Sequence, residues 1–184
     1  MDKLLKLGYT NLWLELGLLT EQKLDEQLIE FEQNNDDNRE HYRYQTFRNY
    51  LTTRQILTDT EFDNYLKVAD SEKDKSMASS ALSDILQKTQ LTDFQFDKVC
   101  SKVTELGFET LTKKIIPRQV LLRRLKSENL TGELFIESLT SDDSIVQKYL
   151  LSVADTNQLK QIAKNGATKA IRNIATERLN KVRR

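Results

Sequence analysis

The chain has 184 residues, enough for one domain or two small ones with a sizeable core. Only 5 Gly and 1 Pro occur, too few for the turns of a hairpin-rich β fold, and Leu, Lys, Glu, Gln and Asp dominate, as in helices. Lys plus Arg and Asp plus Glu balance at 28 each, and 38% of the residues are hydrophobic, so we expect a thin, well-solvated helical core.

The first predicted element is the apolar N-terminal stretch, residues 1–19. Charged residues such as Asp2, Lys6 and Glu15 interrupt it, and it has no small-residue cleavage site, so a signal peptide or membrane span is not expected. The pattern predicts an amphipathic helix that could dock on a second copy of the chain. The apolar residues available for that homo-oligomer are Leu4, Leu5, Leu7, Leu12, Trp13 and Leu16.

A Leu-Thr pattern then recurs and predicts helix starts. In QILTDTEFDNYL, Thr58 is the expected N-cap, and Leu57 and Phe62 have the spacing of a hydrophobic staple. The threonines that take the same role in the other copies are Thr20, Thr92 and Thr131. The intervals of 38, 34 and 39 residues between them suit a two-helix repeat that must stack on its neighbours.

Each start follows another run with helical apolar spacing, so the predicted unit is helix, short turn, helix. These runs cover residues 12–16, 44–51, 81–86 and 120–125, the last after Pro117, which suits a first helical turn. The polar runs 32–40 and 69–76 are short enough to be loops between helices.

The run HYRYQTFRNY, residues 41–50, is rich in aromatic residues. Helical spacing puts Phe47 and Tyr50 on one side and leaves Tyr42, Arg43 and Arg48 outside. Because Tyr and Arg are common in protein-binding hot spots, these three are candidate interaction residues. The alternative is that the aromatic residues fill the core between repeats.

The C-terminal third predicts three short helices. Ser141 or Asp142 is the expected cap of the first, and the second runs from Asp155, a further N-cap, to Lys164 before a stop at Gly166. The first helix is expected to face inward with Ile145, Val146, Tyr149, Leu150 and Val153. The last helix carries Ala167, Ala170, Ile171, Ile174, Ala175, Leu179 and Val182 at helical spacing.

Two resemblances follow from these patterns. Residues 110–182, with Leu130-Thr131, Asp142-Asp143 and NGATKAIRNIATERL, resemble HEAT-like and leucine-rich-repeat-variant arrays. That resemblance implies an all-α fold of antiparallel helical pairs stacked as a short HEAT/ARM-like right-handed superhelical array. LWLELGLLTEQKLDEQL, from Leu12 to Leu28, resembles a helical segment of the N-terminal domain of type II secretion ATPases, although no Gly-rich phosphate loop accompanies it.

Charge is distributed unevenly. Residues 1–100 hold 12 Lys/Arg and 19 Asp/Glu, whereas residues 101–184 hold 16 and 9. We therefore expect one all-helical domain, 1–184, with an acidic subregion 1–109 and a basic subregion 110–184. A basic face indicates a nucleic-acid or acidic-protein partner, or only a solvated helix surface. The candidate residues on this face are Arg118, Arg123, Arg124, Lys164, Lys169 and Arg172.

Residues with catalytic or metal-binding chemistry are scarce. His41 is the only histidine and is expected at the surface, and Cys100 is the only cysteine and is expected to be a small buried hydrophobe beside Phe96, Val99 and Val103. One His and one Cys cannot form the usual structural zinc sites, and no phosphate loop, nucleophile elbow or calcium loop occurs. We therefore expect no enzyme activity, cofactor or metal.

The sequence thus favours a non-catalytic protein–protein interaction module, of the adaptor, scaffold or immunity type. Nucleic-acid binding through the basic C-terminal helices is the alternative, and an enzyme without local motifs is a third. The single cysteine indicates a reducing compartment, so we expect a cytoplasmic protein without a membrane span.

Overall fold

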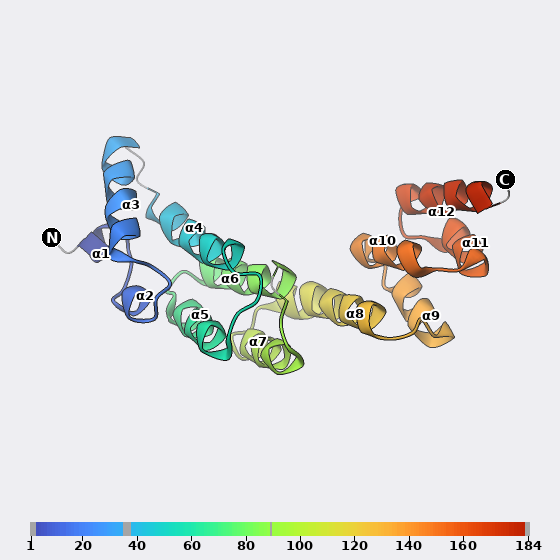
Figure 1. Cartoon of the computed structure of the whole chain (residues 1–184), viewed down its shortest axis with the longest axis horizontal. Helices are drawn as coiled ribbons and strands as arrows, with labels where there is room; N and C mark the ends of the chain where they lie inside the picture. Colours follow the sequence, from blue (N-terminus) through green and yellow to red (C-terminus); the bar gives the residue numbers. More distant parts are fainter. Residues whose placement is uncertain (1–2, 35–37, 89, 183–184) are drawn as a thin grey trace. The chain divides into compact units, whose positions relative to one another are not determined.

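The computed structural model describes residues 3–34, 38–88 and 90–182. Over these residues the fold is all-α, as predicted, with no strand. The helices (Figure 1) are α1 (Lys3–Lys6), α2 (Leu12–Glu15), α3 (Glu21–Asn34), α4 (Arg39–Thr52), α5 (Asp59–Ser71), α6 (Lys75–Lys88), α7 (Asp93–Glu105), the π-helical turn η1 (Leu111–Ile115), α8 (Ile116–Ser127), α9 (Gly132–Thr140), α10 (Ser144–Val153), α11 (Thr156–Asn165) and α12 (Lys169–Val182).

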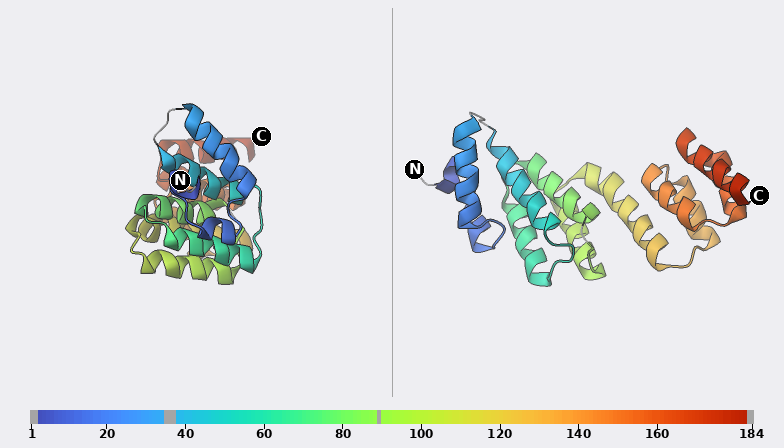
Figure 2. Two further views of the ribbon diagram at one scale, coloured as in Figure 1. Left: turned by 90° about the vertical axis from the view of Figure 1, so that its left-hand side faces the viewer. Right: turned by 45° about the horizontal axis from the view of Figure 1, so that its top comes forward.

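The chain divides into two compact units, residues 1–115 (unit 1) and 116–184 (unit 2). In unit 1, α6 packs against α4, α5 and α7, and α5 also contacts α7 (Figure 2). Its core includes Leu82, Ile85 and Val99, all with no measurable exposure. A column of aromatic rings extends this core, with ring centroids 5.0 Å apart for Tyr9 and Trp13 and 4.5 Å apart for Trp13 and Phe47.

The N-terminal stretch differs from its prediction. It forms two single-turn helices, α1 and α2, instead of one amphipathic helix, because the chain turns at Gly8 with a φ of +74°. This turn lets Leu4, Leu7 and Trp13 enter the core of unit 1. Among the apolar residues expected to reach a second copy, Leu5 alone is largely exposed, at 64%.

The predicted helix starts are confirmed. Thr58 and Thr92 cap α5 and α7 through complete capping boxes with Glu61 and Gln95. Asp155 forms another box with Gln158 at the start of α11. The caps without a complete box are Thr20, which accepts from the backbone of Lys23, and Thr131, which accepts from Leu134.

The helix expected near Pro117 begins earlier, with the π turn η1. Proline has no N–H, so Pro117 cannot make the hydrogen bond that an α-helix requires four residues back. The π turn η1 ends two residues before this break in the hydrogen-bond ladder.

In unit 2, α10 contacts α8 and α12 as well as α9, and α11 packs against α12 and α9. The shared core contains Leu134, Val146, Leu150 and Ile162. The cap of α10 is Asp143, whose carboxylate accepts from the backbone of Ile145 and Val146, so the prediction of Ser141 or Asp142 is wrong.

Some residues that were predicted to face the core of unit 2 are exposed or only half-buried. Ile145 and Val153 are 45% and 42% exposed, and Tyr149 is half-buried. On α12, Ile171 and Ala175 are buried, Ala170 is exposed and Ile174 is 36% exposed. The side chain of Val182 lies outside the described residues.

Candidate functional site

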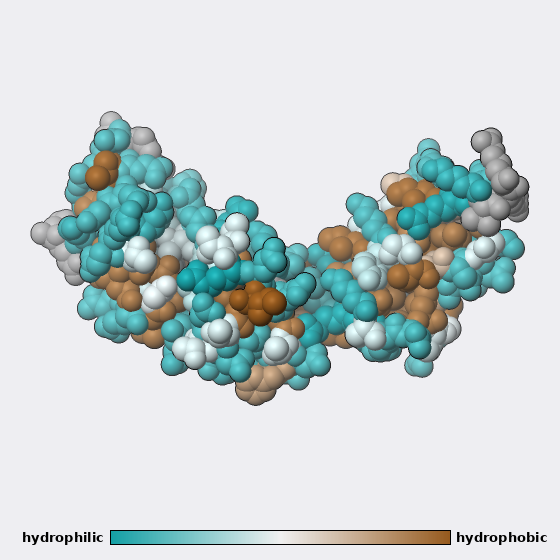
Figure 3. Space-filling model, viewed as in Figure 1, coloured by the Kyte–Doolittle hydropathy of each residue, from teal (hydrophilic) through white to brown (hydrophobic). Residues whose placement is uncertain are grey.

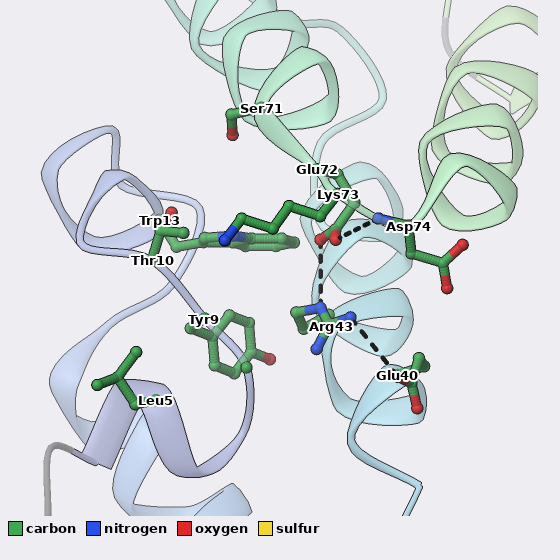
Figure 4. Close-up of a pocket in the computed structure, with 11 residues that line it drawn as sticks. Leu5, Tyr9, Thr10, Trp13, Glu40, Arg43, Ser71, Glu72, Lys73 and Asp74 are labelled. Carbon is green, nitrogen blue, oxygen red and sulfur yellow. Dashed lines mark hydrogen bonds and ion pairs between the residues drawn. The ribbon is translucent and has the colours of Figure 1, made fainter.

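A pocket of about 440 Å³ with both apolar and charged lining residues lies in unit 1, between the N-terminal turns and the α5–α6 connection. Figure 4 shows Arg43 between Glu72 and Glu40, with Tyr9 and Trp13 on the facing wall. The lining residues are Leu5, Gly8, Tyr9, Thr10, Trp13, Glu40, Arg43, Ser71, Glu72, Lys73 and Asp74.

Arg43 organises this pocket. Its Nε donates to Glu72 at 3.2 Å and its Nη1 donates to the carbonyl of Leu7 at 3.2 Å. The other carboxylate oxygen of Glu72 accepts from the backbone N–H of Asp74 at 3.1 Å. A Cβ on Gly8 would lie 2.2 Å from Nη1 of Arg43, so only glycine allows this approach. Arg43 therefore ties the N-terminal turns to α4 and to the end of α5.

Tyr9 makes a second buried connection. Its hydroxyl donates to Gln27 at 2.8 Å and lies 2.7 Å from the hydroxyl of Thr46. Burial raises the pKa of Tyr9 to about 12, more than the hydrogen bonds of Thr46 and Gln27 lower it. The phenol is therefore protonated at neutral pH and cannot act as a base there. The buried polar groups of Tyr9 and Arg43 are thus satisfied by partners within unit 1.

The predicted Tyr/Arg interaction patch is only partly present. Tyr42 and Arg43 are 4% and 7% exposed, so their prediction as surface residues is wrong. Tyr42 packs edge-on against Phe31 with centroids 5.9 Å apart, and Arg43 is drawn inward by Glu72 and Leu7. Arg48 is exposed, as predicted, with its guanidinium 5.7 Å from the ring of Tyr44.

Several of the basic candidates of unit 2 bind groups within that unit. Arg118 donates to Asp143 at 2.7 Å, Arg124 pairs with Glu128 and Glu137, and Arg172 donates to the carbonyl of Gly166 at 2.6 Å. Arg123 is half-buried, while Lys164 and Lys169 are exposed. Arg118, Arg124 and Arg172 therefore bind other parts of unit 2.

An apolar stripe lies on the surface of α10. Its residues were expected in the core because of their helical spacing in the sequence. Ile145, Tyr149 and Val153 are spaced by four residues and lie on the outer side of the helix. The buried side of α10 consists of Val146, Gln147, Leu150 and Leu151. Because α10 is apolar on two faces, periodicity alone could not tell which face is covered. Figure 3 shows apolar atoms at the surface over α10 and α12.

The helices around this stripe carry mostly positive charge. The 36 residues of α8, α10 and α12 include nine Lys or Arg but a single carboxylate, Glu177. Lys126 of α8 lies 5.9 Å from the ring centroid of Tyr149, and Arg178 of α12 donates to the carbonyl of Leu151. We call the outer side of α8, α10 and α12 the α10 face.

His41 is exposed and Cys100 is half-buried rather than fully buried, although Phe96, Val99 and Val103 beside it are buried as predicted. Within the described residues, no group of three or more His, Cys, Asp or Glu side chains is arranged to hold a metal ion. No helix formed by those residues combines the length and apolar character that crossing a membrane requires.

Comparison with protein families, with curated proteins and with solved structures finds no match to this chain.

Proposed function

We propose that this protein is a non-catalytic protein-binding module that uses the α10 face. The stripe of Ile145, Tyr149 and Val153 is the observation that carries this proposal. Solvent-exposed apolar side chains at helical spacing, rimmed by charged residues, are typical of surfaces that bind a partner. An adaptor, scaffold or immunity-type role in the cytoplasm is compatible with such a surface.

The same proposal includes a HEAT/ARM-like stacking of helical pairs. It is supported by the recurrent caps at Thr20, Thr58, Thr92 and Thr131 and by the contacts of α10 with α8 and α12. Arrays of this kind present one layer of helices as an extended binding surface. The N-terminal turns have no part in the proposed surface, because Leu4, Leu7 and Trp13 are buried in unit 1.

Crosslinking capture from the native host tests the proposal. Ile145→Asp combined with Val153→Asp places two charges on the stripe and should abolish recovery of the partner. Ile136→Asp is the matched control, because Ile136 is 50% exposed on α9, and it should leave recovery unchanged. Capture of the same proteins by all three forms would refute a role for the α10 face.

Nucleic-acid binding is the second candidate, favoured by the nine cations and one carboxylate of α8, α10 and α12. Binding to phosphates releases counterions, so affinity would fall steeply as salt rises. A gel shift at low salt with DNA and RNA of random sequence tests it. Absence of any retardation by the full chain would eliminate this candidate.

A further inference from the structure

The stripe on α10 has dimensions that fit one helix. Ile145 and Val153 are eight residues apart, so the stripe is about 12 Å long at 1.5 Å per residue. That length corresponds to about two turns of a partner helix, which presents apolar residues at positions i, i+3, i+4 and i+7. Recognition of a helix by an apolar strip between neighbouring helices is a common binding mode, and it needs no free strand edge.

The charged residues around the stripe indicate which charge the partner carries beside its apolar face. Lys126 borders it on the α8 side, and Lys148 lies on α10 itself, with both residues exposed. On the α12 side, Ile174 and Arg178 lie one turn apart, and Arg178 donates to the backbone of α10. Glu177 is the single carboxylate that these three helices contain. The exposed carboxylates Asp142 and Asp155 lie beyond the two ends of α10, so the positive charge of Lys126 and Lys148 lies along the helix. Acidic edges of a partner helix would be attracted there, whereas basic edges would be repelled.

The residues at the centre of the α10 face favour a protein partner over a nucleic acid. Nucleic acids are held by Arg and Lys that reach phosphates, yet Arg118 and Arg124 already pair with carboxylates of unit 2. Ile145, Tyr149 and Val153 offer no hydrogen bond donor for a phosphate except the Tyr149 hydroxyl. Burying these side chains is favourable only against an apolar surface of the partner.

We propose that the α10 face binds a single amphipathic helix of a partner protein, with apolar residues on the stripe and Asp or Glu on the edges facing Lys126 and Lys148. This inference rests on the proposed function and specifies the chemistry of the partner. The apolar contact supplies the main attraction, and the lysines fix the sign and orientation of the bound helix.

Selection from a displayed library of random 18-residue peptides on the immobilised full chain tests the inference. We expect enriched peptides with helical apolar spacing and net negative charge. Their Kd should rise at least tenfold for Ile145→Asp and at least tenfold for Lys126→Glu with Lys148→Glu. Ile136→Asp should bind them as the wild type does. Circular dichroism of each variant establishes that it is folded, and the lysine variant retains the apolar stripe.

The possible outcomes are distinct. Peptides that need Ile145 but are basic or neutral would overturn the acidic-helix inference and leave the protein-binding function standing. Absence of enrichment, or enrichment unaffected by Ile145→Asp, would overturn the inference, and host partners equally insensitive to the stripe variant would overturn the function as well. A concentration-dependent dimer in sedimentation, abolished by Ile145→Asp, would assign the stripe to a second copy. A gel shift abolished by the lysine variant alone would assign it to nucleic acid.

Discussion

At the scale of single residues, Arg43 and Glu72 form a buried ion pair in unit 1. Their side chains are 8% and 6% exposed and lie 3.2 Å apart. A buried ion pair contributes little net stability, because both charges lose their hydration. Removing one partner is different, since the remaining charge stays buried without its counter-charge.

We expect Arg43→Met to lower the free energy of unfolding of unit 1 by about 3–5 kcal/mol. Adding Glu72→Leu should recover most of that loss, because no unpaired charge is left. Arg48→Met is the control on the same helix and should cost less than about 1 kcal/mol, since its side chain is 52% exposed. Urea denaturation measures all three, and an Arg43→Met protein as stable as the wild type would contradict the assignment.

Alanine substitutions at two glycines, Gly8 and Gly17, test how closely Arg43 packs against Gly8. Gly8 and Gly17 have φ of +74° and +70°, so alanine at either position costs about 1–2 kcal/mol in backbone strain. A Cβ at Gly8 also meets Arg43 at 2.2 Å, whereas nothing lies within 4 Å of one at Gly17. Gly8→Ala should therefore lower the urea midpoint more than Gly17→Ala does. Equal shifts would mean that Arg43 moves aside freely.

At the scale of elements, α10 depends on one carboxylate. Asp143 caps the helix and receives a hydrogen bond from Arg118 at 2.7 Å. Burial alone would raise the pKa of Asp143, but Arg118 and the N–H groups of Val146 and Ile145 together lower it below its ordinary value of 3.8. A lowered pKa means that the folded state binds the proton less readily than the unfolded state.

The stability from Asp143 is therefore fully present above about pH 4 and is lost as the pH falls through the lowered pKa. We expect the urea midpoint of Asp143→Asn to fall less than that of the wild type between pH 6 and pH 3. Asparagine remains a good N-cap, so the variant should fold. Asp142→Asn, at an exposed neighbour, should keep the pH dependence of the wild type.

Helix starts could be predicted from the sequence because each cap uses residues within four positions of one another. Thr58 with Glu61 and Asp155 with Gln158 are examples, and both boxes form. The burial of Arg43 could not be predicted, because its partners Leu7 and Glu72 are 36 and 29 residues away. The exposure of Ile145 could not be predicted for a related reason. Periodicity groups residues into faces but does not tell which face a neighbouring helix covers.

At the scale of the whole molecule, the division at residue 115 predicts two unfolding transitions. Trp13 is the only tryptophan and is 1% exposed in unit 1, so its fluorescence follows that unit alone. Circular dichroism follows both units. We expect the two signals to give different midpoints in urea, and Arg43→Met to shift the fluorescence transition while a second dichroism transition stays in place. Coincident transitions for every variant would show one cooperative unit.

The two hydrogen bonds that Arg43 donates, one to Leu7 and one to Glu72, also determine the order in which parts of unit 1 can fold during synthesis of the chain. Residues 3–19 leave the ribosome before α4 and α5 do. The buried cation that contacts them comes from α4, and its counter-charge, Glu72, follows α5. Until Glu72 has emerged, Leu4, Leu7 and Trp13 have no completed core to enter. The earliest-made segment of unit 1 is thus among the last to settle, and it is exposed to chaperones and proteases throughout that interval.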